Sequence, residues 1–341
     1  MENKLDFIPD SKLKLMDQVR QVLRHYQYSE NTEKIYCDWI VKYIQFFNAR
    51  NYSSKMQGKE INMFLDYLGS NKKASPATQK QALNALIFLY QKVLAKKIPQ
   101  DIKDIKLSST KALPVVMSQD EVIRLFSYMK KTNLLMAKIL YGCGFRLMEC
   151  LRLRIQDVNF ETGNISVRSN KKRKDRIVML PQSIREELLL QKEKIREIHK
   201  QDLRKGYGAI GLPETISMNA DFSVKSFGFQ YLFAAKKVVK DLRTGKMRRH
   251  HAPESGLQKA VKTAARKAMI EKKISCQTFR HSFAAHLLEN GEDIKKVQKL
   301  MGHSNLKMTK KYIKVMTKKP PEVISPLDII QESISNNTGI L

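Results

Sequence analysis

The chain has 341 residues, of which 42% are hydrophobic, so it can form folded domains and is not a disordered basic tail. It carries 63 Lys and Arg against 33 Asp and Glu, a formal net charge of +30, which indicates a polyanionic partner. No apolar run approaches the ~20 residues of a membrane span, and Met1 to Asp10 lacks the apolar core of a signal peptide. We therefore expect a cytoplasmic protein that binds nucleic acid and no membrane.

The cysteines and histidines do not predict a metal site. None of the cysteines forms a C-x-x-C pair, which is typical of reduced thiols in a cytoplasmic protein. These residues are Cys37, Cys143, Cys150 and Cys276. His250 and His251 are adjacent, but neighbouring side chains without cysteine partners rarely chelate one ion. We expect neither a metal nor a cofactor, and interpret this histidine pair as two contact residues on a basic loop.

Residues 1–100 are expected to form an N-terminal helical bundle. Ser29 is suited to cap one helix, and Ser75 followed by Pro76 at the first helical position starts another. Apolar residues after Ser75 recur at helical spacing and predict a buried stripe. Residues 101–116 break this periodicity with prolines and lysines, so we interpret them as an interdomain linker.

A second domain is expected over residues 117–319. It opens with Ser118 and Glu121, the pattern of a capping box, and helices continue to about Arg154. Alternating residues from Val158 to Arg168 and from Lys174 to Leu180 predict two short strands joined by a turn. From Pro181 to Lys319 helices are expected to dominate. The fold class is therefore mainly α, with a small β-hairpin or sheet in the second domain.

Two arginines, a histidine and a tyrosine follow one another along the second domain: Arg146, Arg280, His303 and Tyr312. Cleavage of a phosphodiester builds negative charge on the non-bridging oxygens, and an enzyme must stabilise it. The sequence has no acidic cluster suited to two metal ions. Arginine, whose planar fork grips phosphate through paired hydrogen bonds, is therefore the expected clamp.

These four residues, in this order and spacing, resemble the active site of the tyrosine recombinases, the superfamily of Xer, Cre and phage lambda integrase. The resemblance implies a tyrosine that attacks DNA and joins covalently to the 3′ phosphate. It makes Tyr312 the nucleophile, makes Arg146, Arg280 and His303 the phosphate site, and gives Glu149 a supporting role. It also implies a two-domain clamp around DNA, with residues 1–100 as a SAM-like core-binding domain and 117–319 as an α+β catalytic domain.

The resemblance further makes Lys171 the general acid that protonates the leaving 5′ oxygen. The ordinary pKa of lysine, about 10.4, is too high for ready proton release, and like-charged neighbours should lower it. Those neighbours, Lys172, Arg173 and Lys174, are interpreted as phosphate contacts. Gln277 stands where the family usually has histidine; its amide can donate a hydrogen bond but cannot carry a proton.

An insertion at about 207–251 resembles the one that marks integron integrases. These enzymes integrate and excise gene cassettes and use a folded single-stranded cassette site. The resemblance rests on an expected extra helix around Phe229 and on a run of basic residues and histidines. It implies DNA contacts by Phe229, Arg248, Arg249, His250 and His251. Aromatic faces suit bases that stick out of a stem, since stacking contributes ~1–3 kcal/mol per base.

The expected protein is thus an integron-type recombinase associated with the nucleoid, a monomer in solution and a homotetramer across two DNA sites. Residues 320–341 are interpreted as a tail that docks, in the assembled tetramer, on a neighbouring subunit. One alternative is a DNA-binding protein with weakened or lost catalysis, supported by Gln277. Another is a different tyrosine recombinase or a type IB topoisomerase-like enzyme, against which the insertion weighs.

Overall fold

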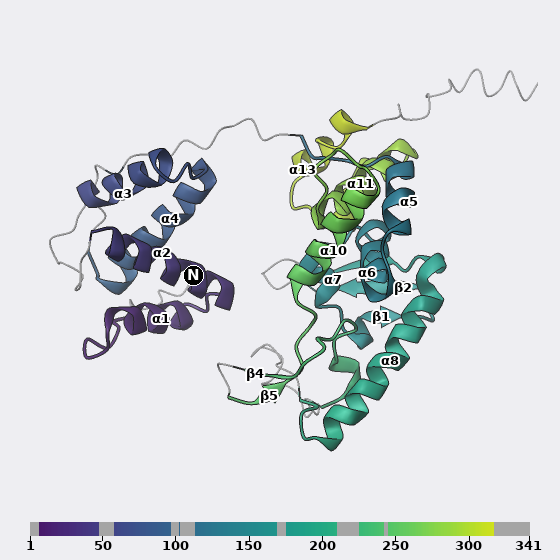
Figure 1. Cartoon of the computed structure of the whole chain (residues 1–341), viewed down its shortest axis with the longest axis horizontal. Coiled ribbons are helices and arrows are strands. Elements are labelled where there is room, and N and C mark those ends of the chain that lie inside the picture. Colours follow the sequence, from purple (N-terminus) through teal and green to yellow (C-terminus); the bar gives the residue numbers. More distant parts are fainter. Residues whose placement is uncertain are drawn as a thin grey trace, which may run out of the picture. The chain divides into compact units, whose positions relative to one another are not determined.

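The protein is described by a computed structural model, which covers residues 7–47, 58–96, 102, 113–168, 175–209, 225–241 and 245–316. The chain divides into two compact units, Met1–Lys111 and Ala112–Leu341 (Figure 1). Both are mainly helical, and the second also holds two small antiparallel sheets. The predicted fold class is thereby confirmed. Within the described ranges, no helix has the length and apolar character needed to cross a membrane.

The N-terminal unit is a helical bundle. It consists of α1 (Leu15–His25), α2 (Glu30–Phe46), α3 (Gly58–Ser70), α4 (Pro76–Phe88) and the π-helical turn η1 (Leu89–Val93). Helices α2 and α3 both pack against α4. The Ser29 Oγ accepts a hydrogen bond from the Thr32 N–H at 3.2 Å, and the Ser75 Oγ accepts one from Thr78 at 3.2 Å. Both predicted helix starts are confirmed.

The C-terminal unit opens with the predicted capping box. The Ser118 N–H donates to the Glu121 carboxylate at 2.7 Å, and the Glu121 N–H donates to the Ser118 Oγ at 3.2 Å. The longer helices are α5 (Gln119–Ser127), α6 (Lys131–Gly142), α8 (Arg185–Arg204), α10 (Glu254–Lys267), α11 (Cys276–Glu289) and α12 (Ile294–Met301). The shorter ones are α7 (Leu147–Leu151), α13 (Lys307–Lys310) and the 3-10 turns Ile155–Asp157, Gln182–Ile184, Phe227–Phe229 and Ile313–Val315.

Helix α11 is the centre of this unit. It packs against α6, α10 and α12, and most of its side chains are buried. Helix α8 runs along the outside of the unit beside the sheet of β1 and β2 (Figure 1). Residues from α11 therefore reach both the turn before α7 and the segment that follows α12, and this is what assembles the site described below.

A three-stranded antiparallel sheet stands where two strands are predicted. Its strands are β1 (Val158–Asn159), β2 (Asn164–Val167) and β3 (Arg176–Met179), in the order β1-β2-β3. The single strand predicted for Val158 to Arg168 is wrong, because a tight turn divides it. The Asn159 Oδ1 accepts the N–H groups of Glu161 and Thr162 at 2.9 and 3.0 Å, and Gly163 follows with a φ of +64°.

The insertion does not continue the helical pattern. Strands β4 (Val239–Lys240) and β5 (Met247–Arg248) form an antiparallel ribbon at the end of the unit opposite α13 (Figure 1). The prediction that helices dominate from Pro181 to Lys319 is therefore wrong for this segment. Around Phe229, where an extra helix is expected, the described residues form only a 3-10 turn, and residues 210–224 lie outside the described ranges.

Candidate active site

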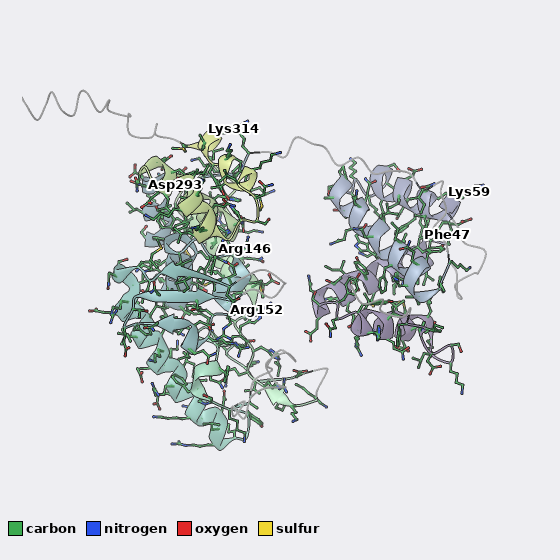
Figure 2. The ribbon with its side chains drawn as sticks, turned by 180° about the vertical axis from the view of Figure 1, so that it is seen from behind. Phe47, Lys59, Arg146, Arg152, Asp293 and Lys314 are labelled. Carbon is green, nitrogen blue, oxygen red and sulfur yellow. The ribbon has the colours of Figure 1, made fainter. Side chains whose placement is uncertain are left out.

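A tight turn places Arg146 at the start of α7. Gly144 has a φ of +62°, a left-handed conformation that L side chains rarely adopt, and a Cβ there would lie 2.3 Å from the Phe283 ring. The turn therefore requires glycine. Arg146 follows it as the N-cap of α7, with 34% of its side chain exposed (Figure 2). Its guanidinium can reach a ligand from solvent.

Glu149 holds Arg146 in this position. Its carboxylate accepts the Arg146 backbone N–H at 2.8 Å and a guanidinium N–H at 2.7 Å. The same two carboxylate oxygens also accept hydrogen bonds from both terminal nitrogens of Arg176 on β3, at 2.9 and 2.7 Å. Burial raises the pKa of Glu149, but Arg176, Arg146 and Arg280 outweigh it and lower that pKa to about 2. The carboxylate is therefore charged at neutral pH.

Arg280 is buried on α11, with 1% of its side chain exposed. Its NH1 donates to the Gly144 carbonyl, and its NH2 donates to the Met301 carbonyl. NH1 also lies 3.7 Å from the Glu149 carboxylate. Burial, and then repulsion by Arg146, lowers the pKa of Arg280 to about 9, so its guanidinium stays charged at neutral pH. Arg280 thus joins α11 to the turn before α7 and to the end of α12.

Tyr312 is buried in the same region and stacks on His303. The two ring centroids are 6.1 Å apart and the ring planes differ by 13°. Gly302 ends α12 with a φ of +58°, and the His303 Nδ1 lies 2.9 Å from the Thr309 Oγ1. Burial raises the pKa of Tyr312, while Arg280 and Arg146 oppose that effect. The tyrosine is therefore protonated at neutral pH but lies within the field of both arginines.

His281 contacts the Tyr312 hydroxyl directly. Its Nδ1 lies 2.8 Å from the Tyr312 oxygen, and the ring centroids are 5.6 Å apart. Burial, and then the charges of Lys311 and Arg280, lowers the pKa of His281 to about 4. Burial and nearby cations, Arg280 first among them, likewise lower the pKa of His303 to about 3. Both imidazoles are therefore neutral at neutral pH.

Gln277 lies in the first turn of α11, one helical turn before His281, and its side chain is exposed. Its amide can therefore reach a ligand. The four basic residues of the predicted turn, Lys171, Lys172, Arg173 and Lys174, lie outside the described residues. In the sequence they stand between β2 and β3, whose pairing ends at Val167 and Arg176.

The insertion residues are divided between the core and the surface. The sequence predicts DNA contacts for Phe229 and Arg249, but the Phe229 ring is buried. Arg249 donates to both carboxylate oxygens of Asp202 at 2.5 and 2.7 Å, and to two backbone carbonyls. Both side chains are therefore engaged within the protein and offer no free face to DNA.

Arg248 is as buried as Arg249, with 14% of its side chain exposed against 15%. Its NH1 lies 3.1 Å from the Asp241 carboxylate, and among the described residues its buried Nε has no hydrogen-bond partner. His251 packs edge-on against Tyr231, and burial lowers its pKa. His250 is half-buried. His250 and His251 are therefore the predicted insertion contacts that keep partly accessible rings outside an ion pair with a neighbouring carboxylate.

Two members of the site are not assigned a role by the sequence: Arg176, which binds Glu149, and His281, which binds Tyr312. Both are ordinary residues of a strand and a helix, and their partners come from distant segments. Only the position of His281 directly after Arg280 could have drawn attention to it. The sequence likewise gives no signal for Thr309, whose hydroxyl contacts the His303 ring.

Together these side chains can bind and cleave a phosphodiester. Arg146 is accessible, Arg280 adds a second fixed charge, and the Tyr312 hydroxyl supplies a nucleophile with a neutral imidazole beside it. In the described part of the chain, no group of three or more His, Cys, Asp or Glu side chains could hold a metal ion. The residues that meet here therefore offer phosphate binding and nucleophilic attack.

Family models match both units. The phage integrase family model matches residues 115–319, and the model of the phage integrase N-terminal SAM-like domain matches residues 15–100. A curated integrase/recombinase of Escherichia coli is 36% identical over 322 residues, which cover 94% of this chain and 95% of that protein. The tyrosine recombinase XerD of Oceanobacillus iheyensis is 27% identical over 298 residues, covering 84% of this chain and 88% of XerD.

Solved structures share the fold. A lambda integrase dimer bound to a core site matches with a TM-score of 0.58 and 15% identity, over 91% of this chain and 79% of that one. The XerH recombinase bound to its difH substrate matches with a TM-score of 0.56 and 20% identity, over 89% and 96%. The chain therefore belongs to the phage integrase family and is a tyrosine site-specific recombinase, an enzyme that breaks and rejoins DNA strands.

Proposed function

We propose that Tyr312 is the nucleophile of this recombinase and forms a 3′-phosphotyrosyl bond with DNA. The observation that carries the proposal is the position of its hydroxyl, which bonds to a neutral imidazole at 2.8 Å in the field of Arg146 and Arg280. A phosphate held by these arginines has its negative charge stabilised while the tyrosine attacks. The phosphotyrosyl bond conserves the energy of the broken ester, so rejoining requires no nucleotide cofactor.

The remaining roles follow from the same placement. Glu149 orients Arg146, and His303 and Gln277 donate hydrogen bonds to phosphate oxygens. Tyr312 and Arg280 are both buried, so access of the phosphate to the hydroxyl is part of the reaction. The rate of cleavage therefore depends on how the Tyr312 hydroxyl and the phosphate are positioned, as well as on the bond-forming step.

A nicked suicide substrate tests the nucleophile. Its cut releases a short strand that cannot rejoin, so the wild-type protein should accumulate as an adduct on a 3′ phosphate. Tyr312→Phe should bind DNA and trap nothing. Tyr128→Phe, a change at an exposed tyrosine of the same unit, should trap normally. An adduct that persists in Tyr312→Phe would show that another residue attacks.

Lys171 is proposed as the general acid, with Lys172, Arg173 and Lys174 as backbone contacts. Proton donation to the leaving 5′ oxygen typically contributes about 10²–10⁴-fold in rate, so Lys171→Ala should slow trapping to that extent. In a substrate with sulfur at the 5′-bridging position, the leaving thiolate needs no proton. This substrate should therefore restore the cleavage rate of Lys171→Ala. Equal defects on both substrates would reassign Lys171 to DNA binding.

The subfamily proposed is the integron integrases, which recombine a folded single-stranded cassette site. The insertion at 207–251 supports it through its basic composition. Because Phe229, Arg248 and Arg249 are engaged inside the protein, His250 and His251 are the contacts we retain. A DNA-binding protein without catalysis is the second candidate, and Gln277 is the residue that favours it.

Binding to two DNA forms tests the subfamily. The double change His250→Ala, His251→Ala should weaken binding to a bulged hairpin more than to a matched duplex of the same sequence. Lys200→Ala, at an exposed residue of α8, should not separate the two substrates. Equal losses on hairpin and duplex would mean that the histidines support the fold or grip the backbone in general.

Assembly into a tetramer across two sites is proposed from the family's mode of action. Residues 320–341, which lie outside the described ranges, are the proposed docking tail. Sedimentation of the protein on paired sites should show four subunits. Removal of 320–341 should leave single-site binding and abolish the larger complex. Tetramers that form without the tail would contradict its docking role.

A further inference from the structure

The hydrogen bond between His281 and Tyr312 has a direction that can be worked out. Burial raises the pKa of Tyr312, so its hydroxyl carries a proton at neutral pH. Among the described residues, the His281 Nδ1 at 2.8 Å is the only hydrogen-bond partner of that hydroxyl. A neutral imidazole offers one nitrogen as acceptor. The hydroxyl therefore donates to Nδ1, and the ring proton of His281 lies on Nε2.

We propose that His281 is a catalytic residue that accepts the proton of Tyr312 as this side chain attacks DNA. The inference rests on the proposed role of Tyr312 as nucleophile. In the step, the proton passes from the Tyr312 oxygen to Nδ1 while the oxygen forms its bond to phosphorus. The bond from phosphorus to the 5′ oxygen breaks, and that oxygen takes a proton from the general acid. His281 ends the step as an imidazolium, and it returns the proton when the strand is rejoined.

Among the described residues, the neighbouring groups leave no other acceptor in contact with the hydroxyl. The His303 Nδ1 faces Thr309, and His303 meets Tyr312 by stacking rather than through a hydrogen bond. Gln277 has a neutral amide that cannot take up a proton. Lys311 lies 5.4 Å from the centre of the Tyr312 ring and is a cation, as are Arg280 and Arg146.

The surrounding charges explain how so weak a base can act. Lys311 and Arg280 disfavour the imidazolium of His281 in the free enzyme, in addition to burial. A DNA phosphate bound by the arginines adds negative charge next to them, and negative charge favours a charged imidazole. The phenol oxygen becomes far more acidic as its bond to phosphorus forms. Proton transfer is thus favoured during the attack and disfavoured before it.

Replacement of His281 provides the first test, with the full-length protein and the nicked suicide substrate. His281→Asn keeps an oxygen that can accept the hydrogen bond but cannot take the proton. Its rate of adduct formation should fall about 10²-fold, the lower end of what proton transfer contributes. DNA binding and the melting temperature show whether the variant is folded, and His281→Gln serves as a second variant should His281→Asn fail to fold.

A more acidic nucleophile separates proton transfer from positioning. A tyrosine with several ring fluorines at position 312 is a stronger acid than tyrosine and therefore depends less on a base. It should raise the rate of adduct formation by His281→Asn at least tenfold. In the protein that keeps His281, it should change that rate by much less. If the fluorinated tyrosine rescues nothing, His281 only positions the side chain, and the proposal is overturned.

The other outcomes are equally decisive. A rate for His281→Asn equal to that of the wild type would exclude any role in the step. A faster rate would mean that the hydrogen bond restrains Tyr312 in the resting enzyme, which also overturns the proposal. Failure of the proposed function is distinguishable, because the adduct would then persist in Tyr312→Phe whatever His281 does.

Discussion

Arg176 on β3 donates two hydrogen bonds to the Glu149 carboxylate, at 2.9 and 2.7 Å, and its Nε donates to the Leu300 carbonyl at 2.8 Å. One side chain thereby links the sheet, α7 and the end of α12. The carboxylate lies among Arg146, Arg176 and Arg280, and its charge offsets theirs. The positions of Glu149 and Arg146 therefore depend on a strand residue that is distant in the sequence.

Glu149→Gln should destabilise the protein, because it leaves the buried arginines without their shared counter-charge. Breaking a buried pair in this way typically costs about 3–5 kcal/mol in the free energy of unfolding. Urea unfolding measures the effect. Glu193→Gln, which breaks the exposed pair with Arg196, is the matched control and should cost no more than about 0.5 kcal/mol. Similar losses in both variants would contradict the central role of Glu149.

Gly144→Ala should disrupt the site through the backbone. The added Cβ meets the Phe283 ring at 2.3 Å, and the φ of +62° is unfavourable for alanine. Strain and overpacking together should cost about 3 kcal/mol and displace the carbonyl that Arg280 binds. Gly163→Ala has a similar φ of +64° with no atom within 4 Å, so it should cost only about 1 kcal/mol. Equal unfolding energies for the two variants would contradict the steric argument.

Gln277→His should raise the rate of DNA cleavage or leave it unchanged, and Gln277→Ala should lower it. A neutral amide stabilises the transition state less than a charged donor does, by on the order of 1–2 kcal/mol, or about five- to thirtyfold in rate. Single-turnover trapping on the suicide substrate measures this. A Gln277→His protein slower than the wild type would show that the site is built around glutamine. Cleavage by Gln277→His alone would favour the DNA-binding candidate.

Stability should fall as the pH is lowered from about 6.5 to about 4. The pKa of His281 lies at about 4 and that of His303 at about 3 in the folded protein, against an ordinary 6.5. In this window the unfolded chain binds protons that the folded chain does not, so the free energy of unfolding decreases on acidification. Glu149, with its pKa at about 2, adds to the loss only below its ordinary value of 4.5.

Melting temperatures at pH 7 and pH 5 check this expectation. The wild type should melt at a lower temperature at pH 5, and His281→Asn should show a smaller difference between the two values, because it removes one imidazole whose pKa is lowered in the folded protein. A melting temperature that does not decrease at pH 5 would contradict the neutral state of both histidines in the folded protein.

The sequence by itself determined the helix starts and the family to which the chain belongs. Ser29, Ser75 and Ser118 mark helix starts through local hydrogen bonds, which depend only on residues three positions away. The order of Arg146, Arg280, His303 and Tyr312 indicated the tyrosine recombinases, and the charge of +30 indicated nucleic acid. These are properties of the chain that need no knowledge of which segments meet.

Only the tertiary structure decided how these residues are paired. Arg280 binds the carbonyl of Gly144, Arg176 binds that of Leu300, and both contacts join segments far apart in the sequence. Periodicity indicates that a side chain faces the core, but not which partner it meets there. The same limit explains why Phe229 and Arg249 resemble surface contacts in the sequence: a buried ring and a buried ion pair depend on neighbours contributed by other segments, such as Asp202 of α8.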